Sequence, residues 1–409
     1  MLSSRMHRFS ATSVTTVVAI TFAALTRTAV IVAFGVLANS TVQAQESVKV
    51  GLVAALTGNS ALSGEAVTRG MTIAIDEINA RGGVLGGRKL VLVRRDDESS
   101  PSKGQLAARE LIEKEGVVIV FGGIDTPVSA ALVNVMQELK RPYMGVWAAG
   151  TGITRNGKTP NYMFRVSAMD ERVDLAMLRY AQKAYASKKP GAILVNNSWG
   201  ESNQQGLEKA STELALPLAG VEKYGANDVD TTPQLVRLKS AGADALVLVG
   251  NAAPAAQVMK SLERMGWNVP VVSHWGISGG RFNELAGPRY KDVRFMQTYS
   301  FFGKQSPVGI KVMTELKKRY PEIKAADDIL APVGVANSYD AMMLTALALD
   351  AAGSTDGDKL REGFYKVPDY EGLIKTYKKP FKNGDNDALG DADYIWVQFE
   401  GKNAMPVVR

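Results

Sequence analysis

Cysteine is absent from this 409-residue chain, and histidine occurs only twice, at positions 7 and 274. Without cysteine the protein has no disulfide framework, no thiol nucleophile and no cysteine-bearing metal site. So few histidines exclude a histidine-rich metal site, and a Ser–His–Asp triad would depend on His274 alone. Gly303-Lys304 lacks the upstream glycine of a P-loop, and no G-x-G-x-x-G motif follows the first predicted strand. We therefore expect no catalytic residues, no metal and no cofactor.

Charge is close to balanced once the amino-terminal segment is set aside. The formal net charge is +7 at pH 7, but residues 1–44 carry three arginines and no acid, so the remainder carries +4. Basic residues are interspersed with acids, and we therefore expect no nucleic-acid partner. The basic tract at residues 377–382 is interpreted as a solvated loop, with a nucleic-acid contact as the alternative.

The first 44 residues are ordered as a secretory signal peptide. Basic residues come first, then an apolar stretch, a polar step and the small-residue site Val42-Gln43-Ala44. This order predicts export to the periplasm with cleavage between Ala44 and Gln45. Because Arg27 interrupts the apolar stretch, an internal start at Met6 and an uncleaved anchor stay open. No later stretch reaches the roughly 18–20 apolar residues that span a bilayer, so we expect a soluble mature chain.

Short apolar strands alternate with amphipathic helices along the rest of the chain. Residues 65–80 place apolar side chains at every third or fourth position, which is one face of a helix. Predicted strands such as residues 117–121 and 245–249 are apolar throughout. Such strands are typical of parallel sheets that helices cover on both faces.

The alternation restarts after Arg165, and the two halves echo each other. Residues 111–122 and 238–250 each contain a helix end, a glycine, a buried strand and a glycine-bearing loop. We therefore predict two α/β lobes, each a doubly wound parallel sheet, that face one another across a cleft. Two long helices near the carboxyl terminus and one lone strand at residues 392–399 are expected to complete these lobes.

Several short sequence blocks follow the predicted signal peptide. They are VGLVAALTG at residues 50–58, GE at 64–65, RG at 69–70, IDEINARGG at 75–83, GGRKL at 86–90 and DD at 96–97. Shorter matches follow, among them FR at 164–165 and SYDA at 338–341. Together the blocks resemble the Leu/Ile/Val-type periplasmic substrate-binding proteins of ABC transporters over nearly the whole mature chain.

This resemblance implies a type I periplasmic-binding fold, in which three hinge crossovers join the two lobes. The implied crossovers lie near residues 165–168, 296–299 and 372–376. The N-terminal lobe would comprise residues 45–166 and 299–372, and the C-terminal lobe residues 167–298 and 373–409. The implied function is capture of an amino acid, amide or small organic acid and its delivery to a membrane ABC permease, by a protein that we expect to be monomeric. A ligand-sensing receptor module of the same fold is the alternative.

Loops after the predicted strands supply the candidate ligand-binding residues of the first lobe. Thr126 precedes a helix, so its hydroxyl would lie beside free amides that suit a carboxylate; the alternative is that Asp125 or Thr126 simply caps the helix. The resemblance places Thr126 at the family's carboxylate-binding serine, and it adds the loop Trp147, Ala148, Ala149 and Thr151, together with Ser60 and Ala61.

The second lobe is predicted to contribute Trp199, Asn251 and Trp275, all in loops after strands. A tryptophan is more often a core residue, but glycine-flanked loops favour ring contact with a ligand. By the resemblance, Ser63 replaces an aromatic residue and Ala255 replaces the acid that binds an amino group. We therefore expect a carboxylate or amide that is larger or flatter than leucine. The acidic pair Asp96-Asp97 is interpreted as a surface feature, with a metal site as the alternative.

Overall fold

The structure is a computed structural model that describes residues 46–407. The predicted signal peptide and its cleavage site lie outside the described residues. Among the described helices, none combines the length and the apolar composition that a membrane crossing requires. Two large sheets and one two-stranded hairpin are present in the described residues, and the parts built on the two large sheets are called the first and the second lobe below.

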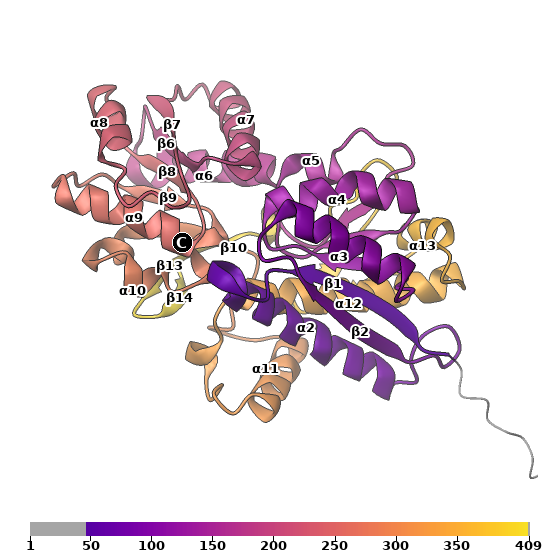
Figure 1. The fold of residues 1–409 in the computed structure, drawn as a ribbon. Coiled ribbons are helices and arrows are strands. Elements are labelled where there is room, and N and C mark those ends of the chain that lie inside the picture. The colour runs from indigo at the N-terminus through magenta and orange to yellow at the C-terminus, as the bar shows by residue number, and fades with distance from the viewer. Residues whose placement is uncertain (1–45, 408–409) are drawn as a thin grey trace, which may run out of the picture. The chain divides into compact units, whose positions relative to one another are not determined.

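The first lobe is built on a five-stranded parallel sheet of order β2-β1-β3-β4-β5. Its β1 and β3–β5 strands are buried almost throughout, which confirms that helices cover both faces. Helices α2 and α12 lie side by side on one face, and α3 and α4 cover the other (Figure 1). The strands are β1 (Val48–Ala54), β2 (Leu90–Asp96), β3 (Val120–Gly122), β4 (Tyr143–Gly145) and β5 (Met163–Arg165).

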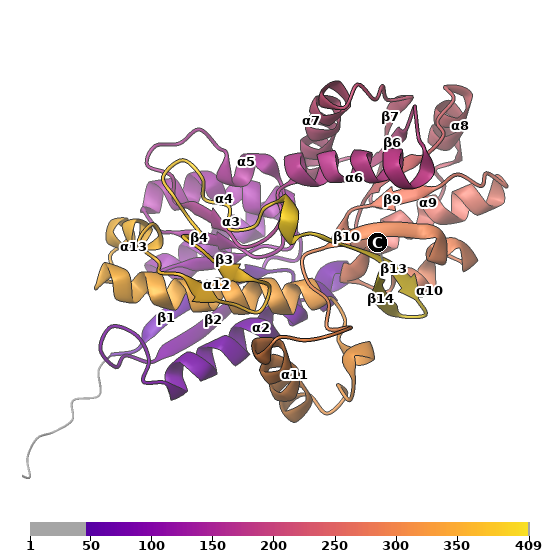
Figure 2. The same ribbon diagram turned by 180° about the vertical axis from the view of Figure 1, so that it is seen from behind.

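The helices of this lobe follow the sequence pattern closely. The apolar face predicted for residues 65–80 is the buried face of α2. Helix α12 is buried on nearly all sides, because it lies between α2 and α13 (Figure 2). The helices are α2 (Ala61–Ala80), α3 (Pro101–Glu113), α4 (Thr126–Leu139), α5 (Thr151–Thr154), α11 (Pro307–Arg319), α12 (Pro332–Ala352) and α13 (Gly357–Phe364).

The second lobe contains a seven-stranded sheet of order β14-β13-β10-β9-β8-β6-β7. Five strands run parallel: β6 (Gly191–Val195), β7 (Gly220–Tyr224), β8 (Leu246–Val249), β9 (Val271–Ser273) and β10 (Val293–Gln297). Helices α6 (Asp170–Tyr185), α7 (Ser198–Glu213), α8 (Thr232–Ser240), α9 (Ala252–Arg264) and α10 (Phe282–Leu285) accompany it (Figure 1). Both sheets therefore have the predicted doubly wound, parallel character.

The carboxyl-terminal region differs from the prediction. The expected lone strand is β13 (Ile395–Glu400), which pairs antiparallel with β10 and with a further strand, β14 (Asn403–Pro406). The expected third crossover at residues 372–376 is instead part of a hairpin between β11 (Tyr370–Glu371) and β12 (Thr376–Tyr377). That hairpin is tied to α12, because the carboxylate of Asp340 accepts hydrogen bonds from the backbone N–H groups of Leu373 and Ile374.

After β12 the chain remains in contact with the first lobe as far as Ala388 before it crosses to the second lobe. Arg165, at the end of β5, holds Asp387 through a buried ion pair with 2.6 Å between Nε and Oδ1. The backbone N–H of Ala388 donates to the carbonyl of Arg165 at 2.9 Å. The third passage to the second sheet therefore lies between Ala388 and the start of β13. The other two passages run from β5 to α6 and from β10 to α11.

Candidate functional site

Loops that follow strands of both sheets converge on one small, partly open cavity. The loops after β3 and β4 reach it from the first lobe, and the loops after β6, β8 and β9 reach it from the second. Open α/β sheets bind ligands at this position, outside the carboxyl ends of the strands. The lining residues are Ile124, Asp125, Thr126, Pro127, Trp147, Ala148, Ala149, Asn197, Trp199, Asn251, His274 and Trp275.

Most of the predicted ligand-binding residues are brought together here. Thr126, Trp147, Ala148, Ala149, Trp199, Asn251 and Trp275 all line the cavity. Ser60 and Ala61 lie outside the lining, where a short 3-10 helix meets α2. Thr151 also lies outside it, and its Oγ1 accepts a hydrogen bond from the backbone N–H of Glu171 at 3.1 Å. No ligand is present, so the ligand contacts of all ten residues stay predictions.

Three helices begin at the cavity, and two of them have no side-chain cap. Asp125 occupies the N-cap position of α4, and Asn251 that of α9, but neither side chain accepts a capping hydrogen bond. On α7, by contrast, Asn197 Oδ1 accepts from the backbone N–H of Trp199 at 2.9 Å. The predicted alternative of simple capping at the start of α4 therefore does not describe the Asp125 side chain. Uncapped helix N-termini carry positive potential and free N–H groups, which suit an anion.

The side chains of Asp125 and Asn251 do not cap their helices and instead hydrogen-bond to each other, which joins the two lobes. Asn251 Nδ2 donates to Asp125 Oδ1 at 2.9 Å, and Ser99 Oγ donates to the other oxygen, Oδ2, at 2.6 Å. A second link joins the backbone N–H of Thr151 to Ser202 Oγ at 3.0 Å. The loops on the two sides of the cavity are therefore in direct hydrogen-bonded contact.

Aromatic rings form the wall that the second lobe contributes. The ring of His274 lies 4.0 Å from that of Trp275 and meets the Trp199 ring edge-on at 5.0 Å, between ring centroids. Gly276 makes this packing possible, because a Cβ there would lie 2.5 Å from Trp199 Cη2. His274 was not among the predicted site residues. Its place directly before Trp275 in the loop after a strand was the signal that could have identified it.

The structure removes two of the arguments for a large ligand, because the residues concerned do not line the cavity. Ser63 lies outside the cavity lining, and its Oγ donates to the carbonyl of Gly279 at 3.0 Å, so it opens no extra room there. Ala255 is fully buried in α9 and is also absent from the lining. The expectation of a flat ligand therefore depends on the aromatic rings alone.

The predicted surface position of Asp97 is wrong, because only 1% of this residue is exposed. It follows β2 at the end of the sheet, and its Oδ1 accepts from the backbone N–H of Ser99 at 2.8 Å. Burial, together with the charges of Asp125 and Asp96, raises the pKa of Asp97 to about 7. In residues 46–407 no group of three or more metal-ligating side chains could hold a metal ion.

One segment matches the letters of a hydrolase nucleophile motif. Residues 276–280 read GISGG, which fits G-x-S-x-G with Ser278 as the nucleophile. The segment lies in a 3-10 helix, η2 (Trp275–Gly279), rather than in a sharp strand-to-helix turn. Ser278 Oγ donates to the carbonyl of Trp275 at 2.7 Å and lines a different hollow. This serine is therefore not presented to the cavity as a nucleophile.

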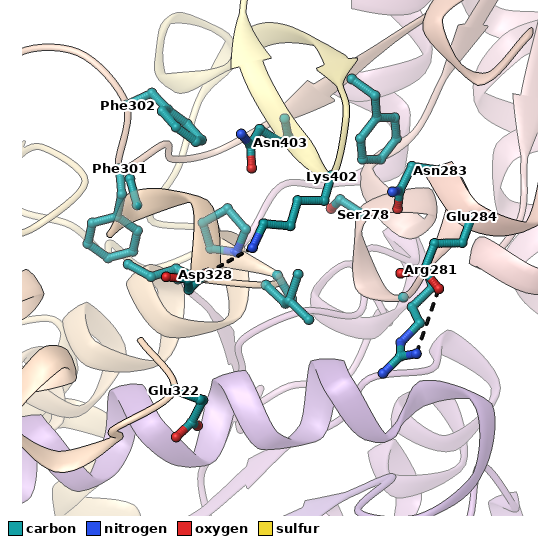
Figure 3. Close-up of a pocket in the computed structure, with 18 residues that line it drawn as sticks. Ser278, Arg281, Asn283, Glu284, Phe301, Phe302, Glu322, Asp328, Lys402 and Asn403 are labelled. Atoms are coloured by element: carbon teal, nitrogen blue, oxygen red, sulfur yellow. Dashed lines mark hydrogen bonds and ion pairs between the residues drawn. The ribbon is translucent and has the colours of Figure 1, made fainter. Parts of the chain in front are cut away.

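A larger hollow lies beside Ser278 (Figure 3). Its charged side chains have both signs, and Lys402 Nζ, on the turn between β13 and β14, donates to Asp328 Oδ1 at 2.7 Å. Because Asp328 precedes α12 of the first lobe, this ion pair also joins the lobes. Uncapped helix N-termini and aromatic rings gather at the smaller cavity, and we therefore place the candidate ligand site there.

Residues 47–403 match the family model described as periplasmic binding protein. The chain belongs to the periplasmic binding protein family. This periplasmic binding protein is 25% identical, over 313 residues, to the Leu/Ile/Val-binding protein homolog 3 of Brucella melitensis biotype 1. The match covers 76% of this chain and 81% of that protein.

Two solved structures show the same fold as this periplasmic binding protein. One is the branched-chain amino acid transporter substrate-binding protein LivJ from Streptococcus pneumoniae in complex with isoleucine. It matches with a TM-score of 0.73 and 21% sequence identity, and the match covers 88% of this chain and 99% of that chain. The other is an ABC transporter solute-binding protein from R. palustris in complex with 4-hydroxybenzoate. It matches with a TM-score of 0.74 and 20% sequence identity, and the match covers 89% of this chain and 96% of that chain. At these identities the likeness shows the fold alone.

Proposed function

We propose that this chain is an extracytoplasmic solute-binding protein that captures a small organic ligand in the cavity between its lobes and delivers it to a membrane ABC importer. The observation that carries the proposal is the cavity itself, because loops from both lobes line it and hydrogen-bond to each other around it. A ligand that contacts both sides stabilises the arrangement in which the lobes are together, and this arrangement is what a permease would recognise.

The ligand class that fits the cavity is a small carboxylate or amide with a flat body. The uncapped N-terminus of α9 provides positive potential for a carboxylate, whereas at the start of α4 the Asp125 carboxylate already lies beside the helix N-terminus. The rings of Trp147, Trp199 and Trp275 provide faces on which a planar group can stack. The two structural neighbours hold an aliphatic amino acid and an aromatic acid, so this fold accommodates both kinds of ligand.

The direct test is mass spectrometry of small molecules released when the purified protein is denatured. We expect a small carboxylate or amide, and small-angle scattering should show that adding it back compacts the emptied protein. A protein that releases nothing, and that no acid or amide in a thermal-shift screen stabilises, would contradict the proposal.

A matched pair of substitutions tests the site. Trp199→Ala should weaken binding of the released ligand about 5- to 150-fold, because a stacking ring contributes on the order of 1–3 kcal/mol. Trp396→Ala removes an indole that stacks on Tyr180 in the second lobe, outside the cavity lining. It should leave the Kd unchanged, and equal effects of the two substitutions would place the ligand elsewhere.

Export is part of the same proposal and rests on the Val42-Gln43-Ala44 motif. Amino-terminal sequencing of the periplasmic protein should find a start at or within a few residues of Gln45. An intact amino terminus in the membrane fraction would favour the ligand-sensing receptor instead.

A further inference from the structure

Asp170 occupies the junction between the lobes, immediately after the chain leaves β5. It is the first residue of α6, and its backbone N–H donates to the carbonyl of Ala149, in the loop after β4, at 2.9 Å. Its side chain is fully buried but does not line the cavity. Its carboxylate can therefore act on a ligand only through the side chains that it holds.

One oxygen of Asp170 holds two of the rings that line the cavity. Oδ1 accepts from Trp199 Nε1 at 3.2 Å and lies 3.1 Å from Nε2 of His274. When the Asp170 carboxylate is ionised it can only accept hydrogen bonds, and Nε2 of His274 then carries the proton in this pair. In the neutral imidazole this leaves Nδ1 as a hydrogen-bond acceptor.

Asp170 has a second acid as its neighbour on the same helix. Asp174 lies one turn further along α6, and burial, followed by the charges of Asp170 and Glu171, raises its pKa well above the usual range. The neutral form of Asp174 is therefore favoured.

Nδ1 of His274 is buried and has no hydrogen-bond partner in the protein. Buried polar atoms rarely lack a partner, and an unpaired one lowers stability. The ring to which this atom belongs lines the cavity, between Trp199 and Trp275. The start of α4 in the first lobe offers backbone N–H donors beside the Asp125 carboxylate, whereas the neutral His274 ring offers an acceptor. The side with the N–H donors therefore suits an acceptor group of a ligand, and the side with His274 suits a donor group.

We propose that Nδ1 of His274 accepts a hydrogen bond from the ligand and that Asp170 is a positioning residue that fixes this tautomer and the ring orientation. The ligand class that fits is a ring-bearing carboxylate with a hydroxyl or N–H donor remote from its carboxylate. This inference rests on the proposed function and names the polar group that selects among ligands.

The test uses benzoate, the three monohydroxybenzoates and their methyl ethers, measured by titration calorimetry on the mature chain. At least one hydroxybenzoate should bind about 5- to 50-fold more tightly than both its methyl ether and benzoate. His274→Phe keeps a ring but removes the acceptor, so it should bind that hydroxybenzoate no better than benzoate. If the preference for the hydroxyl group survives in His274→Phe, the inference is overturned.

The role of Asp170 has its own readout, because His274 is the one histidine that follows the predicted cleavage site. Its ring nitrogens can therefore be assigned directly by ¹⁵N NMR. We expect the Nε2–H tautomer in the parent, a shift of the Nδ1 resonance on adding the hydroxybenzoate, and loss of the single tautomer in Asp170→Asn. Asp174→Asn is the matched control and should change neither the tautomer nor the selectivity.

An Nδ1–H tautomer in the parent complex, or equal effects of Asp170→Asn and Asp174→Asn, would overturn the positioning role without touching the proposed function. If the parent binds no member of the panel, the ligand class is wrong, while the released-ligand experiment still decides whether the protein carries a solute.

Discussion

Gly279 offers a sharp test of whether ligand binding needs the two lobes in contact. It lies in η2 of the second lobe, and its carbonyl accepts the hydrogen bond from Ser63 Oγ of the first. A Cβ at this position would lie 2.3 Å from Ser63 Oγ and 3.0 Å from Trp147 Cζ2. Both contacts are with the first lobe, so an alanine would clash only when the lobes are together.

The size of the effect follows from these contacts. Forcing one extra methyl group into a packed site costs about 1–3 kcal/mol. Losing the hydrogen bond between Ser63 and Gly279 adds about 0.5–1.5 kcal/mol. Gly279→Ala should therefore weaken ligand binding by about 1.5–4.5 kcal/mol, which is roughly a 10- to 2000-fold higher Kd. The thermal stability of the ligand-free protein should change much less, because separated lobes relieve the clash.

Calorimetric titration of the released ligand measures this effect, and small-angle scattering should show no compaction of Gly279→Ala at ligand concentrations that saturate the parent. Adding Ser63→Ala removes the 2.3 Å contact and should recover much of the lost affinity. Gly152→Ala is the control, because a Cβ there meets nothing within 4 Å. A Kd for Gly279→Ala within twofold of the parent, or an equal loss with and without Ser63→Ala, would refute the reasoning.

Three further predictions concern charged groups. Because the pKa of Asp97 is raised to about 7, the folded state holds a proton that the unfolded chain releases at lower pH, so the free energy of unfolding falls as the pH rises from about 4 to 7. Asp97→Asn should flatten this dependence and raise stability at pH 8 by up to about 4 kcal/mol, with no gain at pH 4, in thermal melts across that range. Arg165→Met leaves Asp387 buried without its partner and should lower the free energy of unfolding, measured in urea, by about 3–5 kcal/mol. Lys402→Met removes the ion pair with Asp328 and should weaken ligand binding by less than about fivefold, a difference that 1 M salt should abolish.

The sequence was sufficient to predict the local elements whose pattern is set by burial. Val67, Met71, Ala74 and Ile78 were spaced for one helical face, and all four are buried in α2. The strand at residues 246–249 was recognisable because it is apolar throughout. By contrast, β7 was missed, because this edge strand, with the sequence GVEKY, is only partly buried and lacks a continuous apolar signal.

The sequence also identified which loops would meet. In parallel sheets the carboxyl ends of neighbouring strands share one edge, so residues that directly follow strands are brought together whatever the details of packing. For this reason Trp199 and Trp275 could be placed at one edge of the second sheet from their positions after strands, whereas Trp147, which follows a strand of the first sheet, was assigned to the same cavity through the family resemblance. Thr151 lies farther from the end of β4 and does not line the cavity, because α5 begins at this residue.

Contacts between distant residues were decided only by the tertiary structure. Ser63 meets Gly279, Asp125 meets Asn251 and Asp170 meets His274, each across more than one hundred positions of sequence. The burial of Asp97 and the position of the third crossover, which follows Ala388, were likewise decided by the tertiary structure. Periodicity reports which face of an element is buried, because that depends on neighbours within a few residues. Which side chains then face one another depends on how the two sheets are brought together, and no local pattern encodes that arrangement.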